Sequence, residues 1–178
     1  MAPAAVFLDR DGVLNEPVVR DGKPYPPASL DELVIAEGAR EALERLKAAG
    51  YRLIVVTNQP DVAAGAQRRD VVEAINAALV AALPIDEVRV CYHDDRAACD
   101  CRKPAPGLLL QAPTHDLPRS VMVGDRWRDV EAGARAGVGA CVLIDRAYRE
   151  PLTVQPDARV RTLAQAADWI LGHRVGRP

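Results

Sequence analysis

Short apolar runs alternate along the chain with segments of helical periodicity. The apolar runs are rich in β-branched residues, which is typical of buried strands in a parallel sheet. The predicted strands are Val6–Asp9, Leu53–Thr57, Val88–Cys91, Val121–Gly124 and Cys141–Ile144. Because helical segments separate these runs, the pattern predicts an α/β fold with right-handed crossover connections between parallel strands.

The intervening segments carry apolar residues three or four positions apart, which predicts helices with one buried face. The predicted helices are Gly38–Ala49, Arg69–Leu83, Leu108–Thr114, Arg128–Ala136 and Leu163–Leu171, the last as a helical cap over one edge of the sheet. Helices on both faces of a central parallel sheet form a Rossmann-like three-layer sandwich, which is the fold class that we expect.

The gaps between these elements leave no room for a second domain. Between Asp11 and Gly38 there are 26 residues, many of them Pro, Gly and Asp, which predicts a long loop. The stretch from Thr57 to Lys103 is already filled by a helix, a strand and a cysteine-rich loop. We therefore expect a single domain over residues 1–178, with no separate cap domain and an open site shaped by loops.

Two aspartates one residue apart follow the first predicted strand. Asp9 ends the run, and Asp11 and Gly12 come directly after it. Ligand sites in open α/β sheets lie beyond the carboxyl ends of the strands. There, one carboxylate can act as a nucleophile and the next as a proton donor. The alternative is a strand-end turn that Asp and Gly merely shape.

Polar residues that suit a phosphate follow the later strands. Thr57-Asn58-Gln59 come after the second run and can donate hydrogen bonds to phosphate oxygens. Lys103 is one of only three lysines in the chain. Asp125 and Asp129 lie beyond the strand that ends at Gly124.

The composition excludes several classes of partner. The formal net charge is −2, and no run of Lys or Arg is present, which argues against nucleic acid and anionic membranes. No stretch approaches 18 consecutive apolar residues, so we expect no membrane-spanning helix. We expect a cytoplasmic protein, monomeric, that acts on a small molecule.

Three of the four cysteines lie close together with a histidine. Cys91, His93, Cys99 and Cys101 fall within eleven residues and form the ligand set of a tetrahedral structural zinc site. The alternatives are reduced thiols beside a surface histidine, or a redox pair of Cys99 and Cys101. Cys141 lies in an apolar run and is expected to be a small buried hydrophobe.

These motifs together resemble the haloacid dehalogenase superfamily of phosphotransferases. Its pattern is Asp-x-Asp, a Thr or Ser after a strand, a Lys, and Gly-Asp followed by a second acid, and all four parts occur here in that order. Asp-Arg-Asp-Gly, Thr-Asn-Gln, Cys-x-His and Cys-x-Cys-Arg-Lys-Pro further resemble the D-glycero-D-manno-heptose 1,7-bisphosphate phosphatases and the related histidinol-phosphate phosphatases.

The resemblance implies a Mg²⁺-dependent phosphatase that works through an aspartyl-phosphate on a small sugar phosphate. It implies that Asp9 is the nucleophile and Asp11 the general acid/base, and that Thr57 and Lys103 hold the phosphoryl group. The implied Mg²⁺ ligands are Asp9, Asp125 and the carbonyl of Asp11, with Asp129 as the supporting acid. The implied ligands of a structural Zn²⁺ are Cys91, His93, Cys99 and Cys101. Arg102 resembles a residue for substrate recognition, and Arg10, Asn58, Gln59 and Arg126 are also expected to contact substrate.

One loop departs from the pattern of the heptose enzymes. They usually continue Ser-Gly-Ile-Ala-Arg-Gly after Thr-Asn-Gln, whereas this chain has Pro60-Asp61-Val62-Ala63-Ala64-Gly65. The alternative substrate is therefore histidinol phosphate or another small sugar or polyol phosphate. An alternative of another class is a catalytically silent, zinc-stabilised binding module. Tyr25-Pro26-Pro27 is either a rigid loop or part of a substrate wall.

Overall fold

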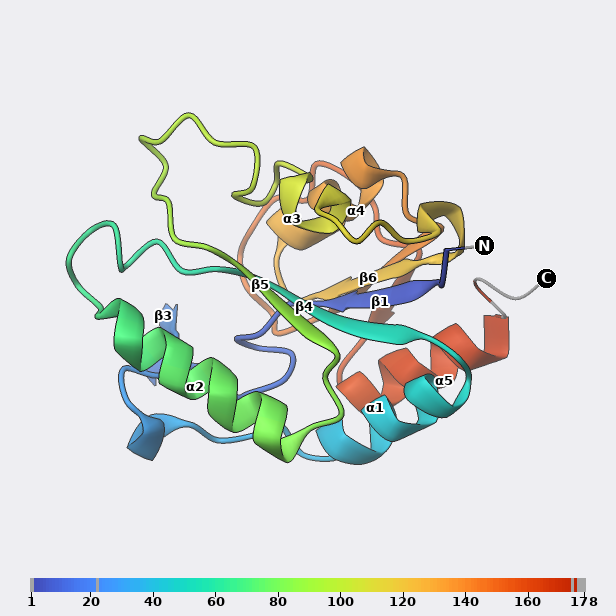
Figure 1. The fold of residues 1–178 in the computed structure, drawn as a ribbon, viewed down its shortest axis with the longest axis horizontal. Helices are drawn as coiled ribbons and strands as arrows, with labels where there is room; N and C mark the ends of the chain where they lie inside the picture. The colour runs from blue at the N-terminus through green and yellow to red at the C-terminus, as the bar shows by residue number, and fades with distance from the viewer. Residues whose placement is uncertain (1, 22, 174, 176–178) are drawn as a thin grey trace.

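The computed structural model describes residues 2–21, 23–173 and 175, and its centre is a six-stranded sheet (Figure 1). The strands lie in the order β5-β4-β1-β6-β7-β8, and every neighbouring pair is parallel. Their bounds are β1 (Ala5–Leu8), β4 (Arg52–Asn58), β5 (Glu87–Cys91), β6 (Val121–Gly124), β7 (Ala140–Ile144) and β8 (Ala158–Val160). The predicted parallel sheet is confirmed.

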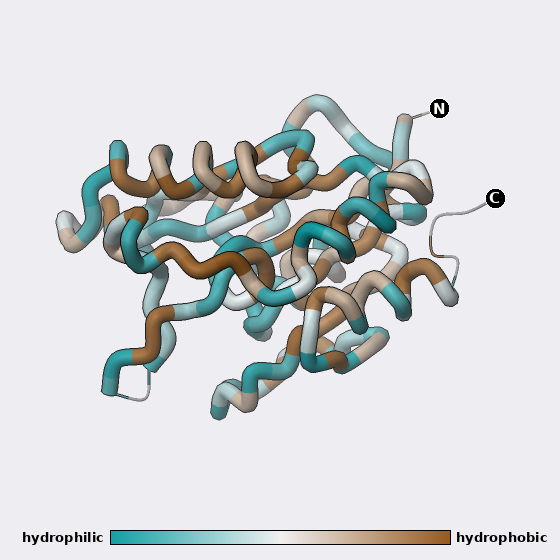
Figure 2. The backbone as a smooth tube through the Cα atoms, turned by 90° about the horizontal axis from the view of Figure 1, so that it is seen from below, coloured by the Kyte–Doolittle hydropathy of each residue, from teal (hydrophilic) through white to brown (hydrophobic). Residues whose placement is uncertain are grey.

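Helices cover both faces of the sheet. On one face lie α1 (Ala39–Ala48), α2 (Arg69–Ala82) and α5 (Leu163–His173), packed over Val6 and Leu8 of β1. On the other lie α3 (Gly107–Leu110) and α4 (Trp127–Ala136), packed over Ala5 and Phe7. Hydrophobic and hydrophilic residues are interleaved along the chain because each helix buries only one face (Figure 2). The three-layer sandwich is confirmed.

The sequence pattern misjudged the end of one helix and missed one strand of the central sheet. The helix expected over Leu108–Thr114 ends at Leu110, since a proline at 113 cannot continue the backbone hydrogen bonds. The strand β8 was not predicted, because none of its three residues, Ala158–Val160, is buried and they form no apolar run. The expected helical cap is α5, which packs beside α1 and over β7 and β8 at one edge of the sheet.

The long gap after Asp11 contains more structure than the predicted loop. It holds an antiparallel hairpin of β2 (Val18–Arg20) and β3 (Lys23–Tyr25), followed by a 3-10 turn at Leu30–Glu32. Such three-residue strands give no clear periodicity, which is why the pattern indicated only a loop. Among the described residues no cap domain is present, as expected.

Loops beyond the carboxyl ends of β1, β4, β5 and β6 gather on one side of the molecule, at the left of Figure 1. The predicted chemistry lies in these loops, since Asp9 follows β1 and Asp125 follows β6. No helix in the described part of the chain is long and apolar enough to cross a membrane.

Candidate active site

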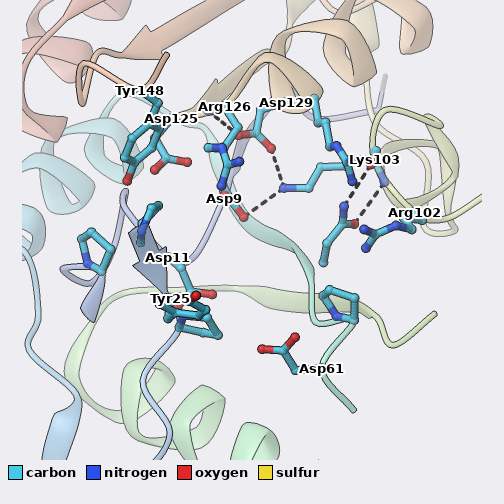
Figure 3. Close-up of a pocket in the computed structure, with 16 residues that line it drawn as sticks. Asp9, Asp11, Tyr25, Asp61, Arg102, Lys103, Asp125, Arg126, Asp129 and Tyr148 are labelled. Carbon is cyan, nitrogen blue, oxygen red and sulfur yellow. Dashed lines mark hydrogen bonds and ion pairs between the residues drawn. The ribbon is translucent and has the colours of Figure 1, made fainter. Parts of the chain in front are cut away.

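The motif residues meet in one pocket of about 320 Å³ at the carboxyl ends of the central strands (Figure 3). Because β4, β1 and β6 are neighbours, they bring Thr57, Asp9 and Asp125 to the same edge of the sheet. The pocket is lined by Asp9, Asp11, Asn58, Lys103, Asp125 and Asp129, together with Tyr25, Asp61, Arg102, Arg126, Arg128 and Tyr148 and four prolines. A volume of this size suits a small substrate.

Lys103 lies between two carboxylates at the bottom of the pocket. Its Nζ is 2.9 Å from Asp9 Oδ1 and 2.6 Å from Asp129 Oδ1, and its side chain is 2% exposed. Burial disfavours the charge of Lys103, but Asp129 and Asp9 outweigh it and hold its pKa above the ordinary value. Lys103 therefore carries a fixed positive charge beside the predicted nucleophile.

One ammonium group does not neutralise the carboxylates around it. Burial, together with Asp129, raises the pKa of Asp9 to about 7 despite the attraction of Lys103. Burial and the charges of Asp9 and Asp129 also raise the pKa of Asp125 well above its usual range. The site as a whole carries an excess of negative charge in a poorly solvated place, which favours a bound cation.

The oxygens of three of these carboxylates lie close enough together to bind one cation. One oxygen each of Asp9, Asp125 and Asp129 lie within 4.8 Å of one another. Asp125 Oδ1 is buried and has no hydrogen-bond partner among the described residues. Hard oxygen donors of this kind suit Mg²⁺, which takes one or two carboxylates and keeps its other positions for water and substrate. The residues present therefore fit the expected Mg²⁺; the Asp11 carbonyl as a ligand stays a prediction.

Two glycines permit this close approach. Gly12 has a φ of +87°, and a Cβ on it would lie 2.0 Å from Asp125 Oδ2. A Cβ on Gly124 would lie 2.1 Å from the Cβ of Asp129. With glycine there, Asp129 folds back against the strand end, accepts a hydrogen bond from the Arg126 N–H at 3.0 Å, and still reaches Lys103.

Asp11 is held by side chains on several sides. Its Oδ1 accepts hydrogen bonds from Arg10 Nε at 3.1 Å and Asn15 Nδ2 at 3.0 Å. Its Oδ2 accepts from Arg10 Nη2 at 3.0 Å and Gln59 Nε2 at 2.8 Å. The expectation that Arg10 contacts substrate is not supported: its side chain is fully buried and pairs with Asp11 and Asn76 instead of lining the pocket.

The Thr57-Asn58-Gln59 segment organises the site from β4. Gln59 is buried, and its Nε2 also donates to Thr57 Oγ1 at 2.9 Å, so it links the threonine to Asp11. Asn58 lines the pocket, and its amide makes two hydrogen bonds to the backbone of Lys103. The structure thus gives Gln59 and Asn58 positioning contacts, and direct contact of either with substrate stays a prediction.

The cysteine and histidine side chains form a second cluster beside the pocket. One ligand atom each of Cys91, His93, Cys99 and Cys101 lie within 4.8 Å of one another. Sγ of Cys91 is 3.1 Å from that of Cys101 and 4.0 Å from that of Cys99, and His93 Nδ1 is 3.3 Å from the Cys101 sulfur. Tetrahedral zinc with bonds of about 2.3 Å spaces its sulfur ligands by about 3.8 Å, which lies between these two sulfur–sulfur distances. The cluster therefore fits a four-coordinate Zn²⁺, whereas no disulfide is present among the described cysteines.

Arginines lie on the rim of the pocket and are paired with acids. Asp95 Oδ1 accepts from Arg102 Nε at 2.8 Å and lies 3.4 Å from Arg128 Nη1. Arg126 is paired with Glu150. All three of these arginines line the pocket. The substrate contacts expected of Arg102 and Arg126 therefore stay predictions.

A segment after β7 contributes residues that the sequence pattern did not reveal. Arg146 donates from Nε to the Gly12 carbonyl at 3.0 Å and from Nη1 to Glu16 Oε2 at 2.6 Å. Tyr148 lies beside Asp125 in the pocket (Figure 3). Glu150 pairs with Arg126. This segment has no motif and no regular periodicity, so no signal in the sequence pointed to it.

Tyr25 at the end of β3 lines the pocket with Pro24 and Pro26 (Figure 3). This position is compatible with a substrate wall, and contact of the segment with substrate stays a prediction. Trp127 instead begins α4, and the guanidinium of Arg128 lies over its ring at 5.3 Å.

The sequence comparisons point to one family. The sequence profile of the haloacid dehalogenase-like hydrolases matches residues 25–137. The chain is 34% identical over 189 aligned positions to the D-glycero-β-D-manno-heptose-1,7-bisphosphate 7-phosphatase of Salmonella typhi, covering 98% of this chain and 93% of that one. Its identity to the enzyme of the same name from Escherichia coli K12 is 35%, covering 98% of this chain and 91% of the relative.

Solved structures give the same result. The D,D-heptose 1,7-bisphosphate phosphatase of B. bronchiseptica, crystallised with magnesium and phosphate, superposes with a TM-score of 0.81 at 29% identity. The alignment covers 96% of this chain and 99% of that one. A putative HAD-like phosphatase of Mesorhizobium loti superposes with a TM-score of 0.79 at 30% identity over 99% of this chain and 89% of that one.

Proposed function

The chain belongs to the haloacid dehalogenase-like hydrolases and is a phosphoric monoester hydrolase, and we propose that it removes the 7-phosphate of D-glycero-β-D-manno-heptose 1,7-bisphosphate. The observation that carries the proposal is the geometry at Lys103, which places a buried ammonium group between Asp9 and Asp129 in an open pocket. A silent binding module would not need a buried, fixed charge at this place. Near-full-length relatives at about 35% identity support the heptose substrate.

Asp9 is the proposed nucleophile. One of its carboxylate oxygens forms a bond to phosphorus while the ester P–O bond breaks on the opposite side. The electron pair of that bond goes to the leaving sugar oxygen, which takes a proton from the carboxyl of Asp11. Water then attacks the aspartyl-phosphate at phosphorus, Asp11 takes its proton, and inorganic phosphate leaves with Asp9 restored.

Positive charge is needed because a phosphate monoester and a carboxylate repel each other. Lys103 supplies one fixed charge, and Thr57 can donate a hydrogen bond to a phosphoryl oxygen. Mg²⁺ held by Asp9 and Asp125 would supply further charge stabilisation for the phosphoryl oxygens when it is bound. Asp129 holds Lys103 in place, since its Oδ1 accepts a hydrogen bond from Nζ at 2.6 Å.

The cysteine cluster is proposed to hold a structural Zn²⁺. Four protein ligands complete a tetrahedral shell and leave no position for a reacting water. Cys101 is two residues from Lys103, so the metal would fix the loop that delivers the lysine. Its role would be to position a catalytic residue.

A second candidate substrate is histidinol phosphate or another small sugar or polyol phosphate. The observation in its favour is Asp61, which lines the pocket (Figure 3). No described residue pairs with that carboxylate, so it would repel a second phosphate at that end of the substrate.

A substrate panel tests the proposal. The purified protein with Mg²⁺ is assayed for phosphate release from heptose 1,7-bisphosphate, histidinol phosphate and hexose phosphates. We expect the highest kcat/KM for the heptose bisphosphate, with heptose 1-phosphate as the product by NMR. A preference of about tenfold or more for another ester would assign the enzyme to that substrate instead.

Action as a cytoplasmic monomer, with no nucleic-acid or membrane partner, stays a prediction. Gel filtration tests the oligomeric state, and an assay on an oligonucleotide 3′-phosphate tests for a nucleic-acid substrate.

A further inference from the structure

Arg10 carries a buried charge, and the proposed mechanism gives this residue no role. Its side chain is fully buried although it lies between the two motif aspartates. Burying a guanidinium group is costly unless its N–H groups find partners of good geometry. Arg10 finds them in Asp11 and in Asn76, a residue of α2 that belongs to none of the motifs.

The contact with Asp11 has the fork geometry of an arginine and a carboxylate. Arg10 Nε reaches Oδ1 at 3.1 Å, and Nη2 reaches Oδ2 at 3.0 Å. A two-point contact of this kind fixes the plane of the carboxyl group, because both oxygens are held by one rigid group. Asn15 and Gln59 each reach only one oxygen, so neither sets the plane alone.

Asn76 in turn fixes the guanidinium. Its Oδ1 accepts a hydrogen bond from Arg10 Nη1 at 2.9 Å, and the bond is buried. The other buried residues of α2 are the apolar Val72, Ile75 and Leu79, so an asparagine on this face requires a polar partner. The chain α2–Asn76–Arg10–Asp11 therefore connects a rigid helix to one carboxyl group.

We propose that Arg10 and Asn76 are positioning residues that orient the Asp11 carboxyl for proton transfer to the leaving oxygen. This inference rests on the proposed function, in which Asp11 protonates the sugar oxygen as the ester bond breaks. Proton transfer requires the carboxyl within hydrogen-bond distance of that oxygen and correctly directed, so a loss of orientation reduces the rate.

The proposal predicts a dependence on the leaving group. An alkyl or sugar alkoxide needs a proton as it departs, whereas 4-nitrophenolate is stable without one. Because kcat/KM reports only steps up to ester cleavage, later hydrolysis of the aspartyl-phosphate does not obscure the comparison. A misoriented Asp11 should therefore harm sugar phosphates and spare 4-nitrophenyl phosphate.

The experiment compares Asn76→Leu and Arg10→Lys with the wild type on heptose 1,7-bisphosphate, or the best substrate of the panel, and on 4-nitrophenyl phosphate. We expect kcat/KM to fall about tenfold or more on the sugar phosphate and less than about twofold on the aryl ester. Asn76→Asp keeps an oxygen acceptor for Arg10 Nη1 and should restore most of the activity on the sugar phosphate.

Two controls separate positioning from a loss of stability. Val72→Ala removes buried volume from the same face of α2 and keeps both polar partners of Arg10, so it should leave the ratio of the two kcat/KM values unchanged. Thermal unfolding confirms that each variant is folded at the assay temperature; if Asn76→Leu does not fold, the comparison rests on Arg10→Lys. Equal losses on both esters, or no loss on the sugar phosphate, would overturn the inference. A wild type inactive on every ester would overturn the proposed function instead.

Discussion

The side chain of Asn58 and the backbone of Lys103 are joined by a pair of hydrogen bonds. Asn58 Nδ2 donates to the Lys103 carbonyl at 3.0 Å, and the Lys103 N–H donates to Asn58 Oδ1 at 3.0 Å. The two residues are 45 positions apart in the chain. Asn58, the last residue of β4, thus holds the loop that carries Lys103. The cysteine cluster lies immediately before Lys103 in the same loop.

Asn58→Ala should lower turnover through Lys103. Without the amide, the loop can shift, and Nζ loses its exact place between Asp9 and Asp129. We expect kcat to fall about tenfold with a smaller change in KM, because the lysine acts most strongly on the charge that develops during transfer. Steady-state kinetics at saturating Mg²⁺ measures this. The control is Gln155→Ala at an exposed position, which should change neither value by more than about twofold. An Asn58→Ala enzyme with wild-type kcat would contradict the positioning role of Asn58.

Asp9→Asn should abolish turnover while the protein stays folded. The amide is a poor nucleophile, so we expect less than about a thousandth of the wild-type kcat. Because Asp9 is one of three clustered carboxylates and shares Lys103 with Asp129, removing its charge should not lower the Tm of EDTA-treated protein. Phosphate release and calorimetry measure the two effects. Residual activity well above that level would exclude Asp9 as the nucleophile.

The two expected metals should be separable. Mg²⁺ at Asp9 and Asp125 keeps solvent ligands and exchanges readily, whereas a closed shell of four protein ligands binds tightly. Brief EDTA treatment should stop catalysis, and added Mg²⁺ should restore it while about one zinc per chain remains bound. Cys99→Ser should lower both Tm and activity in a way that Mg²⁺ does not rescue, and Cys141→Ser should leave the zinc content unchanged. Protein that lacks zinc by elemental analysis, yet is stable and fully active with Mg²⁺, would refute the structural site.

The main features of the fold and site followed from the sequence because they depend on local signals. Five apolar runs gave five strands, and the acids and the lysine stand at fixed places after them. The contacts of Arg10 could not be foreseen, since its burial depends on Asn76, which is 66 positions away. Similarly, Arg146 and Tyr148 reach the site from a segment without periodicity, and only tertiary structure places them there.

Asp86 should stabilise the fold in a pH-dependent way. Its largely buried carboxylate accepts a hydrogen bond from the Leu53 N–H at 2.9 Å and pairs with Lys47 and Arg52, both at 3.1 Å. Burial raises the pKa of Asp86, but the Leu53 N–H and the two cations outweigh it, so the pKa lies below the ordinary value of 3.8. A lowered folded-state pKa contributes stability that is present above the unfolded-state value and is lost as the pH falls below about 4.

Asp86→Asn should therefore lower the free energy of unfolding by about 1–2 kcal/mol at pH 7. The difference from wild type should shrink as the pH falls toward the folded-state pKa. Urea titrations at pH 7, 5 and 3 measure this difference. The control is Asp168→Asn, which removes the exposed partner of Arg45 and should lower the free energy of unfolding by less than about 0.5 kcal/mol. A difference that is constant with pH would show that the carboxylate charge is not the cause.

Asp61 should set the preference between substrates with one and two phosphates. It is an acid without a described partner on the pocket wall, so it repels an anionic group at the far end of the substrate more than a hydroxyl or an amine. Asp61→Asn keeps the size of the side chain and removes the charge. We expect kcat/KM for the bisphosphate to rise about threefold to tenfold relative to the matching monophosphate, with the larger effect at low ionic strength because solvent ions screen this pair. The exposed Asp31→Asn is the control for net charge alone and should leave the ratio unchanged. If Asp61→Asn also leaves the ratio unchanged, the second phosphate does not approach this wall, and the rim arginines are the place to seek it.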